Sequence, residues 1–220
     1  MVPSNVHVQL VEKPTEEIIE EAAQMFAKLM PADPLAVALT GGDISLLPVL
    51  ARAMIKPIAL QIGDMYTATD ENGKLVGFQA WVPPGRLLFN TEEQRKLGFE
   101  DYLSQLSDEA KSYCPQALGK DFPHAIDVLA GMDQTELNTY WCNFNFVAED
   151  WWQKGISKAM TELAYRKAKA NGWTMALATT HIRNVDIYKR LGFELKGLRD
   201  FPSPWNVWQA WIYVWKTKED

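Results

Sequence analysis

The chain has 220 residues, of which 47% are hydrophobic and nine are Trp, and its formal net charge is −6 at pH 7. This length fits one domain with a packed core, or one domain with an insertion. The acidic balance disfavours nucleic acid as a partner, because nucleic-acid binding normally requires a basic face.

The chain shows no uninterrupted apolar run of about eighteen residues and no signal-peptide pattern, so we expect a cytoplasmic protein without a membrane span. Its two cysteines, Cys114 and Cys142, are too few for a disulfide scaffold, and reduced thiols are the better interpretation. Neither cysteine has a Cys or His neighbour at metal-ligand spacing, so no metal site is expected.

The first part of the chain predicts a strand, helices and a hairpin. Alternating residues favour the first strand, Thr15 is placed to cap the helix that follows it, and Asp70-Glu71-Asn72-Gly73 is a hairpin signal. In chain order we expect a strand at 6–11, a helix from Glu16 to Leu29, a loop at 33–43, a helix at 44–54, strands at 65–69 and 75–82, and helical segments at 91–134. We interpret residues 91–134 as an insertion within a single domain of residues 1–220.

The second part alternates strands and helices, which implies an α/β (α+β) fold with at least one parallel strand pair. The expected elements are strands at 139–147, 175–180, 193–198 and 207–215, and helices at 155–170 and 184–191. The last strand carries Trp208, Trp211 and Trp215 in uneven alternation, which we interpret as a sheet edge that pairs with another chain. Monomer and homodimer are both left open.

A basic turn links the strand at 139–147 to the helix after it. Its residues are Gln153, Lys154, Gly155, Ile156, Ser157 and Lys158. Free backbone N–H groups and the helix dipole at such a turn favour a phosphate group. Gly155 and the small Ser157 allow close approach of the backbone, and the two lysines add positive charge. The alternative is a basic helix start that faces only water.

This turn, the strand before it and an Asn-x-x-x-Tyr helix that closes on Leu-Gly-Phe (184–193) resemble the GNAT superfamily of acetyl-CoA-dependent N-acetyltransferases. The likeness is greatest to the puromycin N-acetyltransferase-like branch and covers residues 139–215. It implies a GNAT-type mixed central sheet of about six or seven strands flanked by helices, with acetyl-CoA as cosubstrate. Two residues depart from the family's Gln/Arg-x-x-Gly-x-Gly/Ala pattern, namely Trp152 and Ser157.

The resemblance also implies roles for individual residues. A bulge in the strand at 143–147 would leave the backbone of Phe146 and Val147 free to pair with the pantetheine arm. The amide of Asn184 would hydrogen-bond the pantetheine, and Tyr188, one helical turn later, would be the general acid that protonates the CoA thiolate. The alternative for Tyr188 is a core tyrosine.

The general base is not identified by the sequence. Asn143 and Asn145 stand where a carboxylate would serve, and amides cannot act as bases. His181 has a suitable pKa range, although it can equally be a solvent-facing loop residue, and a water relay would need no side chain. We expect transfer of the acetyl group to the primary amine of a small molecule such as a xenobiotic, antibiotic, amino acid or polyamine. A peptide or protein N-acetyltransferase and a non-catalytic CoA-binding sensor are the alternatives.

Overall fold

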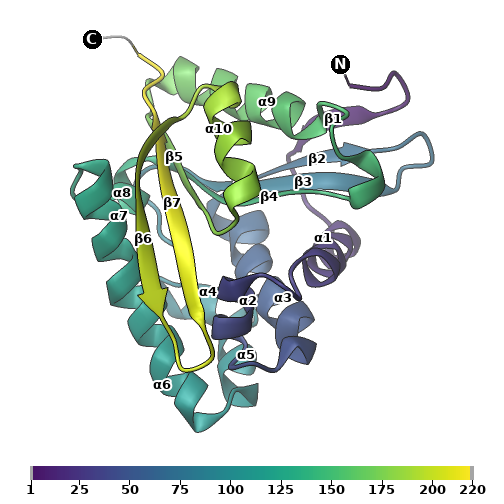
Figure 1. Cartoon of the computed structure of the whole chain (residues 1–220). Coiled ribbons are helices and arrows are strands. Elements are labelled where there is room, and N and C mark those ends of the chain that lie inside the picture. Colours follow the sequence, from purple (N-terminus) through teal and green to yellow (C-terminus); the bar gives the residue numbers. More distant parts are fainter. Residues whose placement is uncertain (1, 219–220) are drawn as a thin grey trace.

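The structure, a computed structural model, describes residues 2–218 and contains one mixed sheet (Figure 1). Its strands follow the order β1-β2-β3-β4-β5-β7-β6, which confirms a mixed sheet of six or seven strands. Their bounds are β1 His7–Val11, β2 Asp64–Thr69, β3 Leu75–Val82, β4 Tyr140–Val147, β5 Met175–Thr179, β6 Glu194–Pro202 and β7 Val207–Trp215. Among the described strands β4 and β5 run parallel, and the other neighbours are antiparallel.

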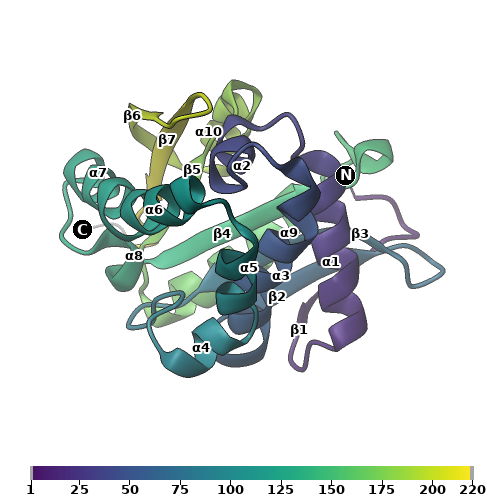
Figure 2. The same ribbon diagram turned by 90° about the horizontal axis from the view of Figure 1, so that it is seen from below.

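Helices cover both faces of the sheet, and Figure 2 shows from below the face that carries α1, α5, α6 and α7. The helices on this side are α1 Glu16–Leu29, α2 Pro34–Leu39, α3 Leu47–Pro57, α4 Glu92–Lys96, α5 Phe99–Gln105, α6 Asp108–Gln116, α7 Phe122–Ala130 and α8 Thr135–Asn138. The other face carries α9 Ile156–Asn171 and α10 Val185–Leu191. Short 3-10 or π turns are η1 Ile44–Leu46, η2 Ile58–Ile62, η3 Ala117–Asp121, η4 Glu149–Trp151 and η5 Ile182–Asn184.

The region from 33 to 43 differs from its expected loop, because it contains helix α2. The Oδ1 atom of Asp33 accepts hydrogen bonds from the N–H groups of Leu35 (2.9 Å) and Ala36 (3.3 Å), and Pro34 begins the helix. An Asp cap followed by Pro is a strong helix-start signal. The two glycines at 41 and 42 made the whole segment look irregular, whereas they only end the helix.

The helix expected at 44–54 begins as predicted and continues to Ile62 through η2. Within the described residues, the segment Ile44–Ile62 is long enough and apolar enough (mean hydropathy 1.4) for a membrane span, and 44% of it is buried inside the molecule. Its charged residues Arg52 and Lys56 pair with Glu20 (2.6 Å) and Glu16 (2.8 Å) of α1. Packing in the core against α1 and the sheet therefore accounts for its apolar character.

The expectation that the last strand is an edge is wrong. β7 lies between β5 and β6, and the two ends of the sheet are β1 and β6. Trp208, Ile212 and Tyr213 are fully buried, because helices cover β7 on both faces. A strand buried on both faces carries large apolar residues without alternation, which explains its uneven pattern.

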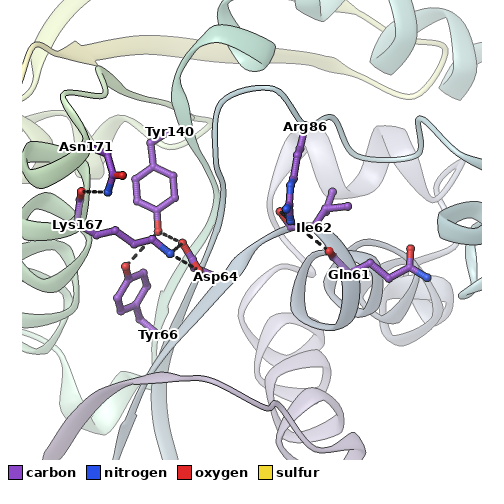
Figure 3. Close-up of polar contacts among 8 residues, drawn as sticks. All are labelled: Gln61, Ile62, Asp64, Tyr66, Arg86, Tyr140, Lys167 and Asn171. Atoms are coloured by element: carbon purple, nitrogen blue, oxygen red, sulfur yellow. Dashed lines mark hydrogen bonds and ion pairs between the residues drawn. The ribbon is translucent and has the colours of Figure 1, made fainter.

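A half-buried ion pair fixes α9 to the sheet. The Nζ of Lys167 lies 2.7 Å from both carboxylate oxygens of Asp64, and the hydroxyl of Tyr140 donates to the same carboxylate at 2.6 Å (Figure 3). The Tyr66 hydroxyl lies 3.1 Å from that of Tyr140. Burial raises the pKa of Tyr140 above its ordinary value, so the hydroxyl keeps its proton and donates it. Asp64 thus has three donor contacts in a largely solvent-free position.

Replacing Lys167 by Met is expected to lower the free energy of unfolding by about 2 kcal/mol, because Asp64 would keep its charge without its cation. This expected loss of stability is smaller than that for a fully buried ion pair, since the Lys167 side chain is 33% exposed. Urea unfolding measures the change. Lys169→Met, on the same helix with its ammonium only over the Tyr165 ring, is the control and should change stability by less than about 0.5 kcal/mol. Equal losses in both variants would contradict the assigned role of the ion pair.

Candidate active site

An opening lies between β4 and β5, beginning at a bulge. Along β3, Trp81 pairs with Cys142 and Ala80 pairs with Phe144, so Asn143 is an extra residue in β4. On its other side, β4 pairs with β5 only from Tyr140 to Cys142. From Asn143 onward the two parallel strands separate. The bulge implied by the family resemblance is therefore present.

The bulge decides which backbone groups face the opening. The N–H of Ala148 donates to the carbonyl of Val76 on β3 (2.9 Å), and alternate residues of a strand face the same neighbour, so Phe146 also faces β3. Consequently the N–H and C=O groups of Asn145 and Val147 face the opening. The expected backbone contact with pantetheine therefore stays a prediction for Val147, whereas the backbone of Phe146 faces β3. The Phe146 ring packs instead between Phe26 and Phe78, with ring centroids 5.4 and 5.6 Å away.

The turn at residues 153–158 has the geometry of an anion site. Gly155 has a φ of 75° and caps α9, and Gln153 also has a positive φ of 62°. Within residues 2–218, no backbone N–H of the turn donates to another protein group. Successive unpaired N–H groups at a helix start form a concave donor surface suited to phosphate oxygens. Gly155 is needed there because its φ is unfavourable for residues with a side chain.

The side chains of the turn serve purposes that the sequence did not indicate. Ser157 points into the molecule, where its Oγ donates to Oδ1 of Asn145 at 3.0 Å, and Ile156 is buried in the core. The exposed Lys154 lies over the ring of Trp151, 4.6 Å from its centroid, and Lys158 is 3.7 Å from Glu162. The two lysines are therefore at the surface of the turn, with charges available to a ligand.

Trp152 connects the turn to both sides of the opening. Its Nε1 donates to the carbonyl of Val147 at 2.7 Å, and the guanidinium of Arg183 lies 4.7 Å from the centre of its ring. The indole of Trp152 is thus hydrogen-bonded to a carbonyl group that faces the opening. Arg183 was not singled out from the sequence, although a basic residue directly before Asn184 was the available signal. It brings a third positive charge towards the turn.

A directed chain of hydrogen bonds ends at Tyr188. The indole Nε1 of Trp81 donates to Oε1 of Gln79 (2.9 Å), whose Nε2 donates to Oδ1 of Asn145 (3.0 Å). The Nδ2 of Asn145 then lies 3.2 Å from the Tyr188 hydroxyl oxygen. Because an indole can only donate, it fixes the orientation of both amides and makes the Tyr188 oxygen an acceptor. Within residues 2–218 no group accepts the hydroxyl proton of Tyr188, which can therefore be donated to a bound molecule.

Tyr188 is only 7% exposed and packs against Phe193 and Tyr213. Burial raises its pKa above the ordinary value of a tyrosine, and nearby Cys142 raises it further, while the Asn145 hydrogen bond opposes the shift. The hydroxyl is therefore protonated at neutral pH. Tyr188 is thus a core tyrosine, as the alternative interpretation of the sequence held, and its role as general acid stays a prediction.

The other two predicted residues, Asn184 and His181, lie at the start of α10. The Nδ2 of Asn184 donates to Oγ1 of Thr179 at 3.0 Å, which leaves its side-chain oxygen as an acceptor. The Nδ1 of His181 accepts from the N–H of Arg183 at 3.2 Å and caps η5. In neutral His181 the other ring nitrogen then carries the proton and has no lone pair to accept another. The geometry consequently disfavours His181 as a base.

Solved structures with the same architecture are acetyltransferases. A structure from Corynebacterium glutamicum ATCC 13032 described as histone acetyltransferase HPA2 and related acetyltransferase is 14% identical, with a TM-score of 0.62 over 97% of this chain and 98% of that one. Arylalkylamine N-acetyltransferase 2 from Aedes aegypti is 17% identical, with a TM-score of 0.59 over 98% and 100%. NAA60 of Arabidopsis thaliana in complex with acetyl-CoA is 12% identical, with a TM-score of 0.55 over 96% and 97%.

No protein-family model and no curated protein sequence matches the chain. The structural likeness extends over nearly the whole length of each chain compared, so the chain has the GNAT acetyltransferase fold. This confirms the fold expected from the sequence. Identities of 12–17% are too low to transfer a substrate. Among residues 2–218, no group of three or more His, Cys, Asp or Glu side chains is placed to hold a metal ion.

Proposed function

We propose that the chain is an acetyl-CoA-dependent N-acetyltransferase that transfers the acetyl group to the primary amine of a small molecule. The observation that carries the proposal is the opening between β4 and β5, which lies between the unpaired N–H groups of the turn and the Tyr188 hydroxyl. A pantetheine arm fits this opening as an added strand, with its amides facing the backbone of Asn145 and Val147. The pyrophosphate then meets the turn, where Lys154, Lys158 and Arg183 contribute charge.

The reaction follows from these positions. A neutral amine attacks the thioester carbonyl, and N–H groups of the bulged strand stabilise the oxyanion that develops. The C–S bond then breaks, and Tyr188 gives its free proton to the departing thiolate. The chain of Trp81, Gln79 and Asn145 holds the tyrosine oxygen as an acceptor, so its proton is directed at the reacting group. A raised pKa keeps that proton in place until charge develops on sulfur.

The acceptor side favours a small amine over an extended peptide. Helices α4 to α8 and the chain between β3 and α4 cover the sheet face that carries Trp141, Asn143 and Phe144. A peptide N-acetyltransferase is the alternative, and proteins of similar fold are described both as a histone acetyltransferase and as an arylalkylamine N-acetyltransferase. An open groove would be required for a peptide.

The proposal is tested by thiol release from acetyl-CoA in the presence of 2-phenylethylamine, spermidine, an amino acid or a peptide with a free N-terminus. We expect release that depends on one of the small amines, with micromolar binding of acetyl-CoA measured by calorimetry. Preference for the peptide would replace the proposed acceptor class. Binding of acetyl-CoA without turnover of any amine would favour a non-catalytic CoA-binding sensor.

The hydrogen bond from the Trp152 indole to the Val147 carbonyl favours such a sensor, because this carbonyl is then not free to bind pantetheine. We expect pantetheine to displace this hydrogen bond. Replacing Trp152 by Phe keeps a ring beneath Arg183 but removes the donor, and should lower the Kd for acetyl-CoA about 5-fold, equivalent to one hydrogen bond of about 1 kcal/mol. Calorimetric titration measures the change, with Trp151→Phe as the control. Weaker binding in the Trp152 variant would mean that the indole N–H remains in place and supports the cofactor site.

A further inference from the structure

A small hollow lies on the acceptor side of β4, on the sheet face opposite Tyr188. Its volume is about 20 Å³, enough for a water molecule or the head of an amine. The lining combines apolar side chains with three polar ones, namely Val82, Leu88, Trp141, Arg86, Glu136 and Asn143. Asn143 is the bulged residue at which β4 separates from β5. The hollow therefore reaches the point where the opening for the thioester begins.

Glu136 has no partner for its carboxylate in this hollow. It lies on the single-turn helix α8, directly before β4, and within residues 2–218 no donor or cation bonds to its oxygens. Arg86, the cation lining the same hollow, donates instead to the carbonyls of Gln61 (3.3 Å) and Ile62 (3.2 Å) at the end of η2 (Figure 3). Because Glu136 is only partly exposed and has no donor among the described residues, its carboxylate is available to a ligand that enters the hollow.

Burial and a neighbouring carboxylate favour the neutral form of Glu136. Burial, and to a smaller extent the carboxylate of Asp127 on α7, raise the pKa of Glu136 to about 7. Asp127 itself accepts from the N–H groups of Gln134 (3.1 Å) and Thr135 (2.7 Å), which hold its negative charge beside α8. A carboxyl that titrates near neutral pH can both take and release a proton under physiological conditions.

We propose that Glu136 binds the acceptor ammonium in this hollow and accepts its proton, directly or through one water. This inference rests on the proposed acetyltransferase function and supplies the base that the sequence left unassigned. Loss of the proton to Glu136 leaves a nitrogen lone pair, which forms the C–N bond at the thioester carbonyl, and the C–S bond then breaks. Tyr188 protonates the thiolate from the other face, the second amine proton restores Tyr188 through solvent, and Glu136 releases its proton to water. One proton is released for each acetyl group transferred.

The test is the pH dependence of kcat/KM for the parent, Glu136→Gln and Glu136→Asp, with the amine that the parent uses best. The base must be ionised, so parent activity should rise with pH through about 7. In Glu136→Gln this rise of kcat/KM with pH (the acidic limb of the profile) should be absent, and kcat/KM should fall at least about 10²-fold. The Kd for acetyl-CoA should be unchanged. Glu136→Asp should retain the limb at a reduced rate. Asp133→Asn removes an exposed carboxylate three residues away and should behave as the parent.

Unfolding measurements provide a second readout that does not depend on turnover. Because the folded-state pKa of Glu136 is raised, the stability of the parent should fall relative to Glu136→Gln as pH rises from about 4.3 to about 7. Parent-like kcat/KM and an unchanged acidic limb in a folded Glu136→Gln protein would overturn the inference. Absence of turnover by the parent with every amine would instead overturn the proposed function, and the inference with it. If Glu136→Gln fails to fold, a parent-like kcat/KM in Glu136→Asp has the same force against the inference.

Discussion

Tyr188→Phe is expected to lower kcat about 10²-fold or more while leaving the Kd for acetyl-CoA nearly unchanged. The substitution keeps the ring in its buried position against Phe193 and Tyr213 and removes the hydroxyl, which is the proton donor and also the acceptor of the Asn145 amide. The thiolate would then leave without an acid, so the loss should appear in kcat and not in KM. Steady-state kinetics with thiol detection, together with calorimetric titration, separate the two constants.

The control for this prediction is Tyr165→Phe, which removes a hydroxyl from a tyrosine that stacks on Trp215. Its kcat should equal that of the parent. The raised pKa of Tyr188 adds a condition on pH, because the acid acts only while protonated. The parent should therefore show no loss of kcat from Tyr188 below about pH 10, the ordinary pKa of tyrosine. An unchanged kcat in Tyr188→Phe would leave the side chain with a packing role only.

Gly155→Glu is expected to raise the Kd for acetyl-CoA by at least about 100-fold. The new carboxylate would stand at the unpaired N–H groups of the turn and repel the pyrophosphate, and a φ of 75° strains any residue with a side chain by about 1–2 kcal/mol. Calorimetric titration measures the affinity, and circular dichroism checks that the chain is folded. If Gly155→Glu bound acetyl-CoA as tightly as the parent, the turn at residues 153–158 would not be the pyrophosphate site.

Gly131→Glu is the matched control. Gly131 ends α7 with a φ of 65°, and a side chain there would meet nothing within 4 Å. It therefore carries the same backbone strain and the same charge change away from the turn. Its Kd for acetyl-CoA should equal that of the parent. A parallel loss of affinity in both variants would indicate strain or partial unfolding and not repulsion of phosphate.

The parts of the site that the sequence predicted are local in the chain. The turn at 153–158 was recognisable because glycine, small residues and lysines stand directly before an amphipathic helix. Asn184 and Tyr188 were recognisable because four residues separate neighbours on one helix face. The expected strands were found because hydrophobic runs and turn residues follow each other within a few positions. Each of these signals requires only a few consecutive residues.

The bulge shows how one residue changes a prediction made by counting along a strand. Side chains and backbone groups alternate with a period of two, so the extra Asn143 exchanges the two sides for every later residue of β4. Asn145 therefore faces the opening in place of Phe146. The pattern of the residues gives no sign of the shift, because Phe144, Asn145, Phe146 and Val147 would fit a strand in either register.

The amino-acid sequence by itself indicated the GNAT fold through its resemblance to that family. It also located the glycine turn before α9 and the helix that carries Tyr188, because turn residues and helical spacing act within a few positions. The tertiary structure alone decided the rest. It joined Gln79 of β3 to Asn145 and Tyr188, brought Arg183 to Trp152, and placed Glu136 in one hollow with Arg86 and Asn143. These contacts join side chains that are close in space but lie on separate elements, and burial, not local pattern, sets their hydrogen bonds and pKa values.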